Sequence, residues 1–175
     1  TNIFAGTYSG VFLSTDNGTN WTQVGLTSKT VLTLAPDSSG NVFAGTYGSG
    51  VFLSTNNGTN WATINTGLTN IIIRSLAVSP AGSRGTNTSA GTWGGGVFLS
   101  TDNGTSWTQT GLTNVYVLSL CVSGPNIFAG TYGKGIFRSS DNGTSWSEVN
   151  SGLIYPYVYT LEKSLDSTGR TNIFA

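Results

Sequence analysis

The sequence is organised around an eight-residue phrase that occurs four times, each time beginning with serine and ending with tryptophan. Asn-Gly, at the centre of the phrase, is the pair best suited to the positive φ angles of a tight reversal, and a Ser or Asp just before it bonds back to turn amides. Each copy also follows a short apolar run, so the pattern predicts four β-hairpins. The copies are S-T-D-N-G-T-N-W at 14–21, S-T-N-N-G-T-N-W at 54–61, S-T-D-N-G-T-S-W at 100–107 and S-S-D-N-G-T-S-W at 139–146.

Within these segments, which we call the Ser-to-Trp turns, the acidic or amide residue is predicted to build the turn. The tryptophan is predicted to bury roughly 150–250 Å² and to anchor the turn to its own sheet. The residues given these structural roles are Ser14, Asp16, Gly18, Trp21, Ser54, Asn56, Gly58, Trp61, Ser100, Asp102, Gly104, Trp107, Ser139, Asp141, Gly143 and Trp146.

The phrase S-x-D-x-G-x-x-W resembles the Asp-box, or BNR repeat, which is found in β-propellers such as sialidases, xyloglucan hydrolases, sortilin-like receptors and photosystem-assembly factors. The resemblance covers all four repeats. It implies a β-propeller fold and says almost nothing about activity.

Other phrases recur around the turns and complete a four-stranded unit. N-x-F-A-G-T begins at Asn2, Asn41 and Asn126, with an altered copy at Asn87, and a richer apolar run precedes the later copies. Four-stranded antiparallel units of about 40–45 residues are typical of propeller blades. We therefore predict an all-β propeller of about four blades with essentially no helix. A parallel β-helix is the alternative, although regular tight hairpins disfavour it.

The repeats alternate between two lengths. Counted from Asn2, the N-x-F-A-G-T phrase recurs at steps of 39, 46, 39 and 46 residues, and the extra length falls in the loops at 79–86 and 163–170. We predict one domain or segment over 1–175. Its repeats lie at approximately 1–30, 31–70, 71–114 and 115–155, and 156–175 complete or begin a further blade.

The last five residues, 171–175, repeat 1–5 letter for letter. In one interpretation the apolar strand expected at 157–161 completes the first blade of a closed four-bladed ring. In the other, which we favour because four blades fit tightly around an axis, the chain is part of a longer array or half of a ring made with a second copy. Open blades expose sheet edges and apolar faces, which predicts protein partners, further copies of the chain among them.

The composition is neutral and poor in charge. Only 8% of the residues are charged, with seven basic and seven acidic side chains, so no basic stripe is expected to bind nucleic acid. Surfaces rich in Ser, Thr, Asn and Gly favour a secreted or cell-surface protein. No run approaches the ~18 apolar residues of a membrane span, so membrane insertion is not expected. A chain that opens at Thr1 without any methionine is expected to be a processed or excised piece.

Catalytic and metal sites are not expected. Sialidases need an arginine triad, and the four arginines here lie in unrelated phrases: Arg74, Arg84, Arg138 and Arg170. Xyloglucan hydrolases use two facing carboxylates. Outside the Ser-to-Trp turns the chain offers only scattered ones: Asp37, Glu148, Glu162 and Asp166. With no histidine and the single Cys121 in an apolar run, which indicates a buried thiol, no metal or other cofactor is expected.

The remaining candidate site is aromatic. Tyr8, Tyr47, Trp93 and Tyr132 each follow Gly-Thr at the hairpin end opposite the Ser-to-Trp turns, and 155–157 add further aromatic residues. These side chains either bind a glycan or protein or merely cap the blades against one another. We interpret the chain as a non-catalytic structural or interaction module. The alternative is a glycan-binding propeller or one associated with a glycoside hydrolase.

Overall fold

The computed structural model describes residues 2–80 and 86–175, and all of the regular structure in these two ranges is β-strand, as the sequence predicts. No helix in the described residues is long and apolar enough to span a membrane. The strands are β1 (Ile3–Thr7), β2 (Gly10–Ser14), β3 (Thr22–Gly25), β4 (Val31–Pro36), β5 (Val42–Thr46), β6 (Val51–Ser54), β7 (Ala62–Thr63), β8 (Ile73–Pro80), β9 (Thr86–Thr92), β10 (Gly96–Ser100), β11 (Thr108–Gln109), β12 (Val117–Ser123), β13 (Asn126–Thr131), β14 (Ile136–Ser139), β15 (Ser147–Glu148), β16 (Glu162–Leu165) and β17 (Thr171–Phe174).

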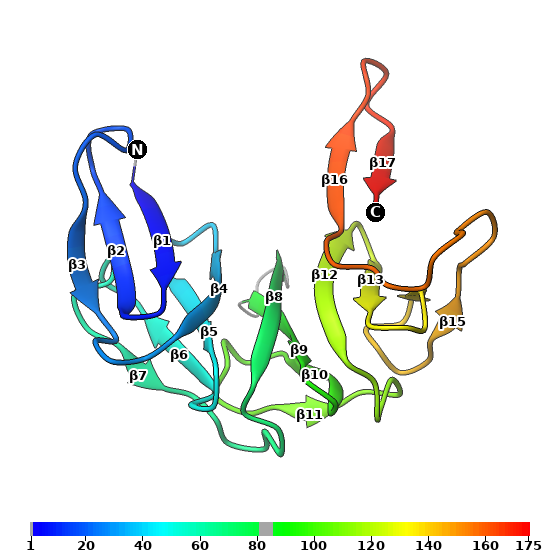
Figure 1. Ribbon diagram of the computed structural model, residues 1–175, viewed down its shortest axis with the longest axis horizontal. Coiled ribbons are helices and arrows are strands. Elements are labelled where there is room, and N and C mark those ends of the chain that lie inside the picture. Colours follow the sequence, from blue (N-terminus) through cyan, green and yellow to red (C-terminus); the bar gives the residue numbers. More distant parts are fainter. Residues whose placement is uncertain (1, 81–85) are drawn as a thin grey trace.

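The strands form antiparallel sheets in which sequence neighbours pair. Three sheets have four strands each, in the orders β4-β5-β6-β7, β8-β9-β10-β11 and β12-β13-β14-β15, and we call them blades 2, 3 and 4. Strands β1-β2-β3 form a three-stranded sheet, blade 1, and β16 and β17 form the C-terminal hairpin. Figure 1 shows these sheets side by side along an open arc, with blade 1 at one end and the C-terminal hairpin at the other.

Successive blades pack face to face, which explains why their strands are apolar on both sides. Phe43, Ile73 and Phe98 are fully buried between blades 2 and 3. The glycine of each A-G-T phrase permits the close approach of the next blade. A Cβ on Gly45 would lie 2.6 Å from Cγ2 of Ile73, and a Cβ on Gly91 would lie 2.6 Å from Cγ1 of Val117.

The strand expected at 157–161 does not form, which corrects the sequence-based prediction. The hairpin ladder begins only at β16, where Glu162 pairs with Phe174, and Tyr157 forms an isolated bridge to Tyr132. In blade 3 the corresponding part of the first strand pairs with Ala90 and Gly91. Strand β17 ends at Phe174, so residues 158–161 have no partner strand for a ladder in the described part of the chain.

The ring is not closed in this structure. Blade 1 has three strands, and β16 pairs with β17 rather than with β1. The closed four-bladed interpretation is therefore not what the single chain adopts. Both long loops are also shorter than expected, because β8 reaches Pro80 and β16 reaches Leu165. Residues 81–85, and Arg84 with them, lie outside the described residues.

Candidate functional site

Each Ser-to-Trp turn is organised by a buried serine hydroxyl. In the third turn, Oγ of Ser100 accepts a hydrogen bond from the backbone N–H of Gly104 at 2.8 Å and donates one to Oδ1 of Asp102 at 2.8 Å. Asn103 and Gly104 adopt the positive φ angles that the Asn-Gly pair predicts. The other three turns repeat these bonds from their own serines, at Ser14, Ser54 and Ser139.

The acidic side chains of the turns accept hydrogen bonds from donors of the same turn. Asp102 accepts one from the backbone N–H of Ser106 at 2.9 Å and one from the hydroxyl of Ser106 at 2.6 Å. Asn56 takes the same place in the second turn, and its Oδ1 accepts the backbone N–H of Asn60 at 2.9 Å. A neutral amide therefore serves where the other turns carry a carboxylate.

These bonds lower the pKa of the turn carboxylates. The pKa of Asp16 falls from 3.8 to about 2, chiefly because the backbone N–H of Asn20 donates to the ionised form. The pKa of Asp141 falls to about 2, chiefly because the hydroxyl of Ser145 does so. The pKa of Asp102 shifts in the same direction, and its largest cause is the hydroxyl of Ser106.

Acid is therefore expected to weaken the turns. A carboxylate with a lowered folded-state pKa stabilises the fold fully above about pH 4, and this contribution is lost as the pH falls from about 4 to about 2. The triple variant Asp16→Asn, Asp102→Asn, Asp141→Asn gives every turn the amide that Asn56 supplies naturally. It should lose less of its melting temperature between pH 6 and pH 3 than the wild type. Thermal melts followed by circular dichroism measure this difference, and equal acid sensitivity of the two proteins would contradict the expectation.

Three of the four tryptophans of the turns join neighbouring blades, which corrects the prediction that each anchors its own sheet. Trp107 of blade 3 is 4% exposed and packs in the core that contains Phe43 and Val51 of blade 2. Its Nε1 donates to the carbonyl oxygen of Ile64 at 2.7 Å, and its backbone N–H donates to that of Thr66 at 2.8 Å. Both acceptors follow β7 of blade 2, so the turn of one blade closes the outer edge of the blade before it.

The indole N–H of each of the other tryptophans donates a hydrogen bond within its own turn. These three side chains differ in the residues that pack against them. Nε1 of Trp21, Trp61 and Trp146 donates to the carbonyl oxygen of the turn glycine. Trp61 packs with Val24 of blade 1, and Trp146 packs in a core with Val97 of blade 3. Trp21 belongs to blade 1 and is 43% exposed.

The aromatic residues after Gly-Thr are held by buried threonine hydroxyls. Oγ1 of Thr92 donates to the carbonyl oxygen of Gly96 at 2.9 Å, and Thr131 does the same to Gly135 at 2.7 Å. The backbone N–H of the following aromatic residue then bonds to the start of the first strand of its own blade, as when Trp93 donates to the carbonyl oxygen of Ile72 at 3.0 Å. The turn thus fixes where each aromatic side chain leaves the sheet.

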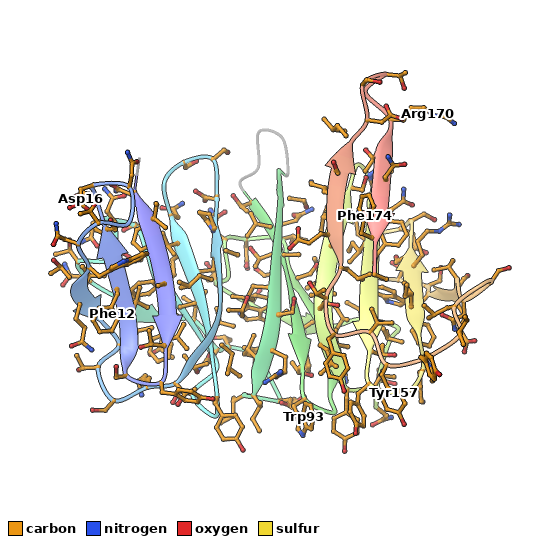
Figure 2. The ribbon with its side chains drawn as sticks, turned by 45° about the horizontal axis from the view of Figure 1, so that its top comes forward. Phe12, Asp16, Trp93, Tyr157, Arg170 and Phe174 are labelled. Atoms are coloured by element: carbon orange, nitrogen blue, oxygen red, sulfur yellow. The ribbon has the colours of Figure 1, made fainter. Side chains whose placement is uncertain are left out.

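Four aromatic side chains, two of which follow Gly-Thr, form a continuous row at one end of blades 3 and 4. The ring centroids of Trp93 and Tyr116 are 4.8 Å apart, those of Tyr116 and Tyr132 are 6.5 Å apart, and those of Tyr132 and Tyr157 are 4.8 Å apart. Each member remains 40–48% exposed. Figure 2 shows Trp93 and Tyr157 at the end of the blades opposite Asp16. We call these four residues the aromatic row.

The structure groups only part of the aromatic set chosen from the sequence. Trp93 and Tyr132 lie in the row, whereas Tyr47 is 63% exposed and Tyr8 is 88% exposed on earlier blades, and neither stacks on the row. The row gains Tyr116, which sequence reasoning missed and which leads into a first strand. Residues at that position form bridges to the aromatic residue of the preceding blade, and this contact between blades leaves no signal within a single repeat.

A cation lies beside the row. The guanidinium carbon of Arg74 is 5.8 Å from the ring centroid of Trp93, and Nε of Arg74 is buried without a hydrogen-bond partner in the described part of the chain. Nδ2 of Asn70 donates to the Trp93 carbonyl oxygen at 3.0 Å. The row therefore combines apolar ring surface with a few polar groups.

Neither a known sequence family nor a curated protein matches the chain in sequence. Solved structures match it in shape. The extracellular domain of a putative one component system from B. thetaiotaomicron has a TM-score of 0.74 and 15% identity, over 98% of this chain and 24% of that chain. An ancestral GH74 enzyme has a TM-score of 0.66 and 23% identity, over 97% and 25%. YCF48 bound to D1 peptide has a TM-score of 0.70 and 18% identity, over 98% and 57%.

The fold is a β-propeller. The match to these structures agrees with the four-stranded antiparallel blades described above. Identities below 25% establish the fold alone, and the chain spans about a quarter of the length of two of these proteins and 57% of the third.

The isolated carboxylates of the propeller serve turns or lie on exposed strands. Oδ1 of Asp37 accepts the backbone N–H groups of Ser39 and Asn41, and Oδ1 of Asp166 accepts those of Thr168 and Arg170. Glu148 lies exposed on β15 and Glu162 lies exposed at the start of β16. Among the described residues, no group of three or more potential metal ligands occurs.

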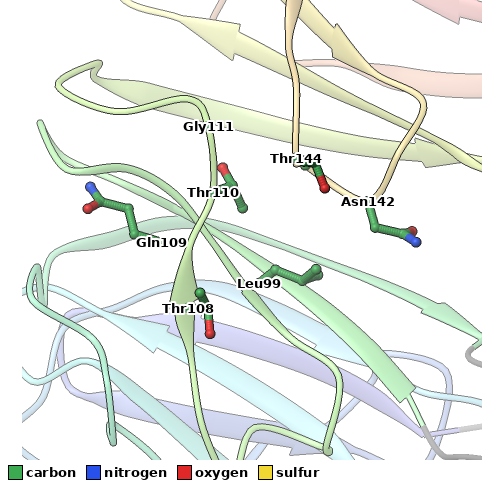
Figure 3. A pocket seen from close by; sticks show the side chains of 8 residues that line it. Leu99, Thr108, Gln109, Thr110, Gly111, Asn142 and Thr144 are labelled. Atoms are coloured by element: carbon green, nitrogen blue, oxygen red, sulfur yellow. The ribbon is translucent and has the colours of Figure 1, made fainter.

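Two further features of the propeller belong to its packing. A cavity of about 420 Å³ lies between β11 of blade 3 and the Ser-to-Trp turn of blade 4 (Figure 3). Its lining contains no titratable side chain, so it is a seam between blades: Leu99, Thr108, Gln109, Thr110, Gly111, Asn142, Gly143 and Thr144. Cys121 is buried, and burial raises the pKa of its thiol.

Proposed function

We propose that this propeller is a non-catalytic, secreted or cell-surface interaction module that binds a protein segment through the aromatic row. The observation that carries the proposal is the row itself, in which Trp93, Tyr116, Tyr132 and Tyr157 are close together and half-exposed. Backbone hydrogen bonds fix Trp93 and join Tyr132 to Tyr116. The residues that contribute most to protein–protein binding energy are often tyrosines and tryptophans that cluster in this way.

The orientation of the rings favours a protein over a sugar. Neighbouring rings are inclined by 51–78° to one another, so they form no flat platform for stacking on successive sugar rings. The half-exposed rings and their tyrosine hydroxyls instead suit apolar side chains and backbone carbonyl groups. YCF48, which shares the fold, was solved with a bound peptide, and this supports the same use of a propeller.

The hydrogen bonds and positions of the carboxylates support a non-catalytic role. The turn carboxylates of Asp16, Asp102 and Asp141 are occupied by donors of their own turns, and we propose that these segments are Asp-boxes with a structural role only. The isolated carboxylates lie on separate sheets and turns, so the described residues offer no facing pair for glycoside hydrolysis.

A glycan is the second candidate ligand, and one observation favours it. Trp93 presents an indole next to Asn70 and the buried Nε of Arg74, a combination that could hold one sugar ring and its hydroxyl or carboxylate groups. The ancestral GH74 enzyme shares the fold, which keeps this alternative in view.

Screening the purified chain against a displayed library of random peptides and against a glycan array separates the two candidates. For the selected peptide, we expect the double variant Trp93→Ala, Tyr132→Ala to weaken binding by more than about tenfold, because truncated hot-spot aromatics typically cost about 2 kcal/mol or more. Isothermal titration calorimetry measures the change. Tyr155→Ala is the matched control, since Tyr155 is exposed and lies outside the row. A glycan ligand without a peptide ligand would support the alternative, and turnover of that glycan would overturn the non-catalytic proposal.

A further inference from the structure

The first strands of blades 2, 3 and 4 contain a bulge at the same place. The pairing register shifts across one residue, which is Leu32 in blade 2, Arg74 in blade 3 and Leu118 in blade 4. A bulge redirects the side chain of its extra residue, and bulges are common beside functional sites. The leucine is half-buried in blade 2 and buried in blade 4. The blade therefore accepts an apolar side chain at this place, and packing alone does not explain the arginine of blade 3.

The guanidinium of Arg74 has a hydrogen-bond donor to spare beside the aromatic row. Its central carbon lies 5.8 Å from the ring centroid of Trp93. Nε of Arg74 is buried, and no group in residues 2–80 and 86–175 accepts a hydrogen bond from it. A buried donor without an acceptor is unfavourable, and the planar guanidinium binds a carboxylate through two parallel N–H···O bonds. A carboxylate of a ligand would therefore satisfy this side chain.

The charged residues are distributed unevenly between the two ends of the blades. The end with the aromatic row is formed by hairpin turns and by the segments that lead into the first strands, namely 8–9, 26–30, 47–50, 69–72, 93–95, 113–116, 132–134 and 154–157. These segments contain Lys29 and Lys134 but no acidic residue. The acidic residues lie on strands or at the opposite end, where Figure 2 shows Asp16: Asp16, Asp37, Asp102, Asp141, Glu148, Glu162 and Asp166. The row thus lies in a positive surface, although the whole chain is neutral, and such a surface favours a partner of opposite charge.

The size of the row sets the length of the segment that it can contact. Arg74 lies at one end, beside Trp93, and Tyr157 lies at the other end. The three separations between ring centroids together correspond to about five residues of extended peptide at most. Away from Arg74 the row offers uncharged ring surface, which suits apolar side chains. The site therefore has one place for an anion and, next to it, room for a short apolar run.

From these observations we propose that the protein segment bound by the aromatic row carries a carboxylate that pairs with Arg74, and that apolar side chains adjacent to this carboxylate contact Tyr116, Tyr132 and Tyr157. The inference rests on the proposed function and adds to it the chemistry of the partner. The carboxylate belongs to an aspartate or glutamate side chain or to the C-terminus of the segment. Arg74 is then the residue that makes the site specific for an acidic partner.

The variant Arg74→Leu tests first whether the arginine serves the fold. It gives blade 3 the residue that blades 2 and 4 carry at the bulge. We expect its melting temperature to equal or exceed that of the wild type, because the substitution removes a buried donor that has no acceptor. Thermal melts followed by circular dichroism measure this. A clearly lower melting temperature would assign Arg74 to packing against Trp93 and would overturn the inference.

Peptides selected from random libraries, displayed with either end free, are the probe for binding. One selected peptide is synthesised in three forms: unchanged, with each acidic residue replaced by its amide, and with an amidated C-terminus. We expect one of the two changes to weaken binding to the wild type by more than about tenfold, since it removes one partner of a charge pair. The form that loses affinity identifies the source of the carboxylate. Isothermal titration calorimetry measures each affinity.

The same peptides on the variants connect the carboxylate to Arg74. Arg74→Leu should weaken binding of the unchanged peptide by a similar factor and should bind the neutralised form no more weakly than the wild type does, because the pair is already lost. Arg74→Lys should recover part of the affinity, since it keeps the charge without the planar fork. Arg138→Leu is the matched control and should leave binding unchanged, because Arg138 is an exposed cation on β14 outside the segments around the row.

These measurements separate the inference from the function on which it rests. Peptides that lose affinity for the double variant Trp93→Ala, Tyr132→Ala but bind Arg74→Leu as well as the wild type would overturn the carboxylate pairing and leave the proposed function standing. Equal effects of Arg74→Leu on the unchanged and neutralised peptides would overturn it in the same way. The absence of any peptide ligand, or binding of acidic glycans alone, would overturn both.

Discussion

Replacing Trp107 by alanine is expected to lower the free energy of unfolding by about 3–5 kcal/mol, the usual range for removing a buried aromatic side chain from a core. The side chain is 4% exposed and fills the space between blades 2 and 3 against Phe43 and Ile64. Its removal leaves a cavity there and also deprives the Ile64 carbonyl oxygen of its indole donor. Because the substitution acts at the contact between two blades, we expect unfolding to become less cooperative as well.

Urea denaturation followed by circular dichroism measures the change in stability, and Trp93→Ala is the matched control. Trp93 is 40% exposed and contacts the aromatic row rather than a core, so its loss should destabilise the protein by much less. Similar losses in the two variants would contradict the view that the tryptophans of the Ser-to-Trp turns join blades.

Replacing Gly67 by alanine is expected to destabilise the propeller by about 2–5 kcal/mol, from the cost of a left-handed conformation together with overpacking. Gly67 has a φ of 88°, and a Cβ there would lie 2.1 Å from the carbonyl oxygen of Trp107. A backbone atom cannot move aside as a flexible side chain can. The turn of blade 3 would therefore have to separate from the edge of blade 2.

Gly40→Ala isolates the packing part of this effect. Gly40 has a φ of 87° and no atom within 4 Å of an added Cβ, so alanine there costs only the conformational strain, about 1–2 kcal/mol. The difference between the two melting curves reports how tightly the blades meet. Equal destabilisation of the two variants would show that the contact at Gly67 relaxes freely.

The local structure of this chain could be predicted well from its sequence. The Asn-Gly turns, the buried serines and the four-stranded repeat follow from short-range chemistry, because positive φ at Asn103 and a hydroxyl within reach of the Gly104 amide depend on neighbouring residues alone. The prediction of a strand at 157–161 failed for the complementary reason. Apolar residues such as Val158 and Leu161 become buried there, yet a ladder also needs a partner strand, which the sequence of the segment does not supply.

The candidate site was predicted in part. Gly-Thr-aromatic phrases placed Trp93 and Tyr132 at one end of the blades, but only the curvature of the arc decides which rings touch. Tyr116 and Tyr157 entered the row because the first strand of each blade begins beside the aromatic residue of the blade before it. That adjacency is a contact between repeats, and a pattern within one repeat cannot reveal it.

The sequence by itself determined the kind of unit that this protein repeats: a four-stranded antiparallel sheet whose turns are fixed by serine, Asn-Gly and an acidic or amide side chain. Tertiary structure alone decided how the units meet, that is, which blade covers Trp107, which aromatic rings form a row, and which edges stay open. The physical reason is the separation along the sequence of the residues that interact. Turn geometry depends on bonds between residues a few positions apart, whereas packing between blades depends on side chains about 40 residues apart that only the folded arc brings together.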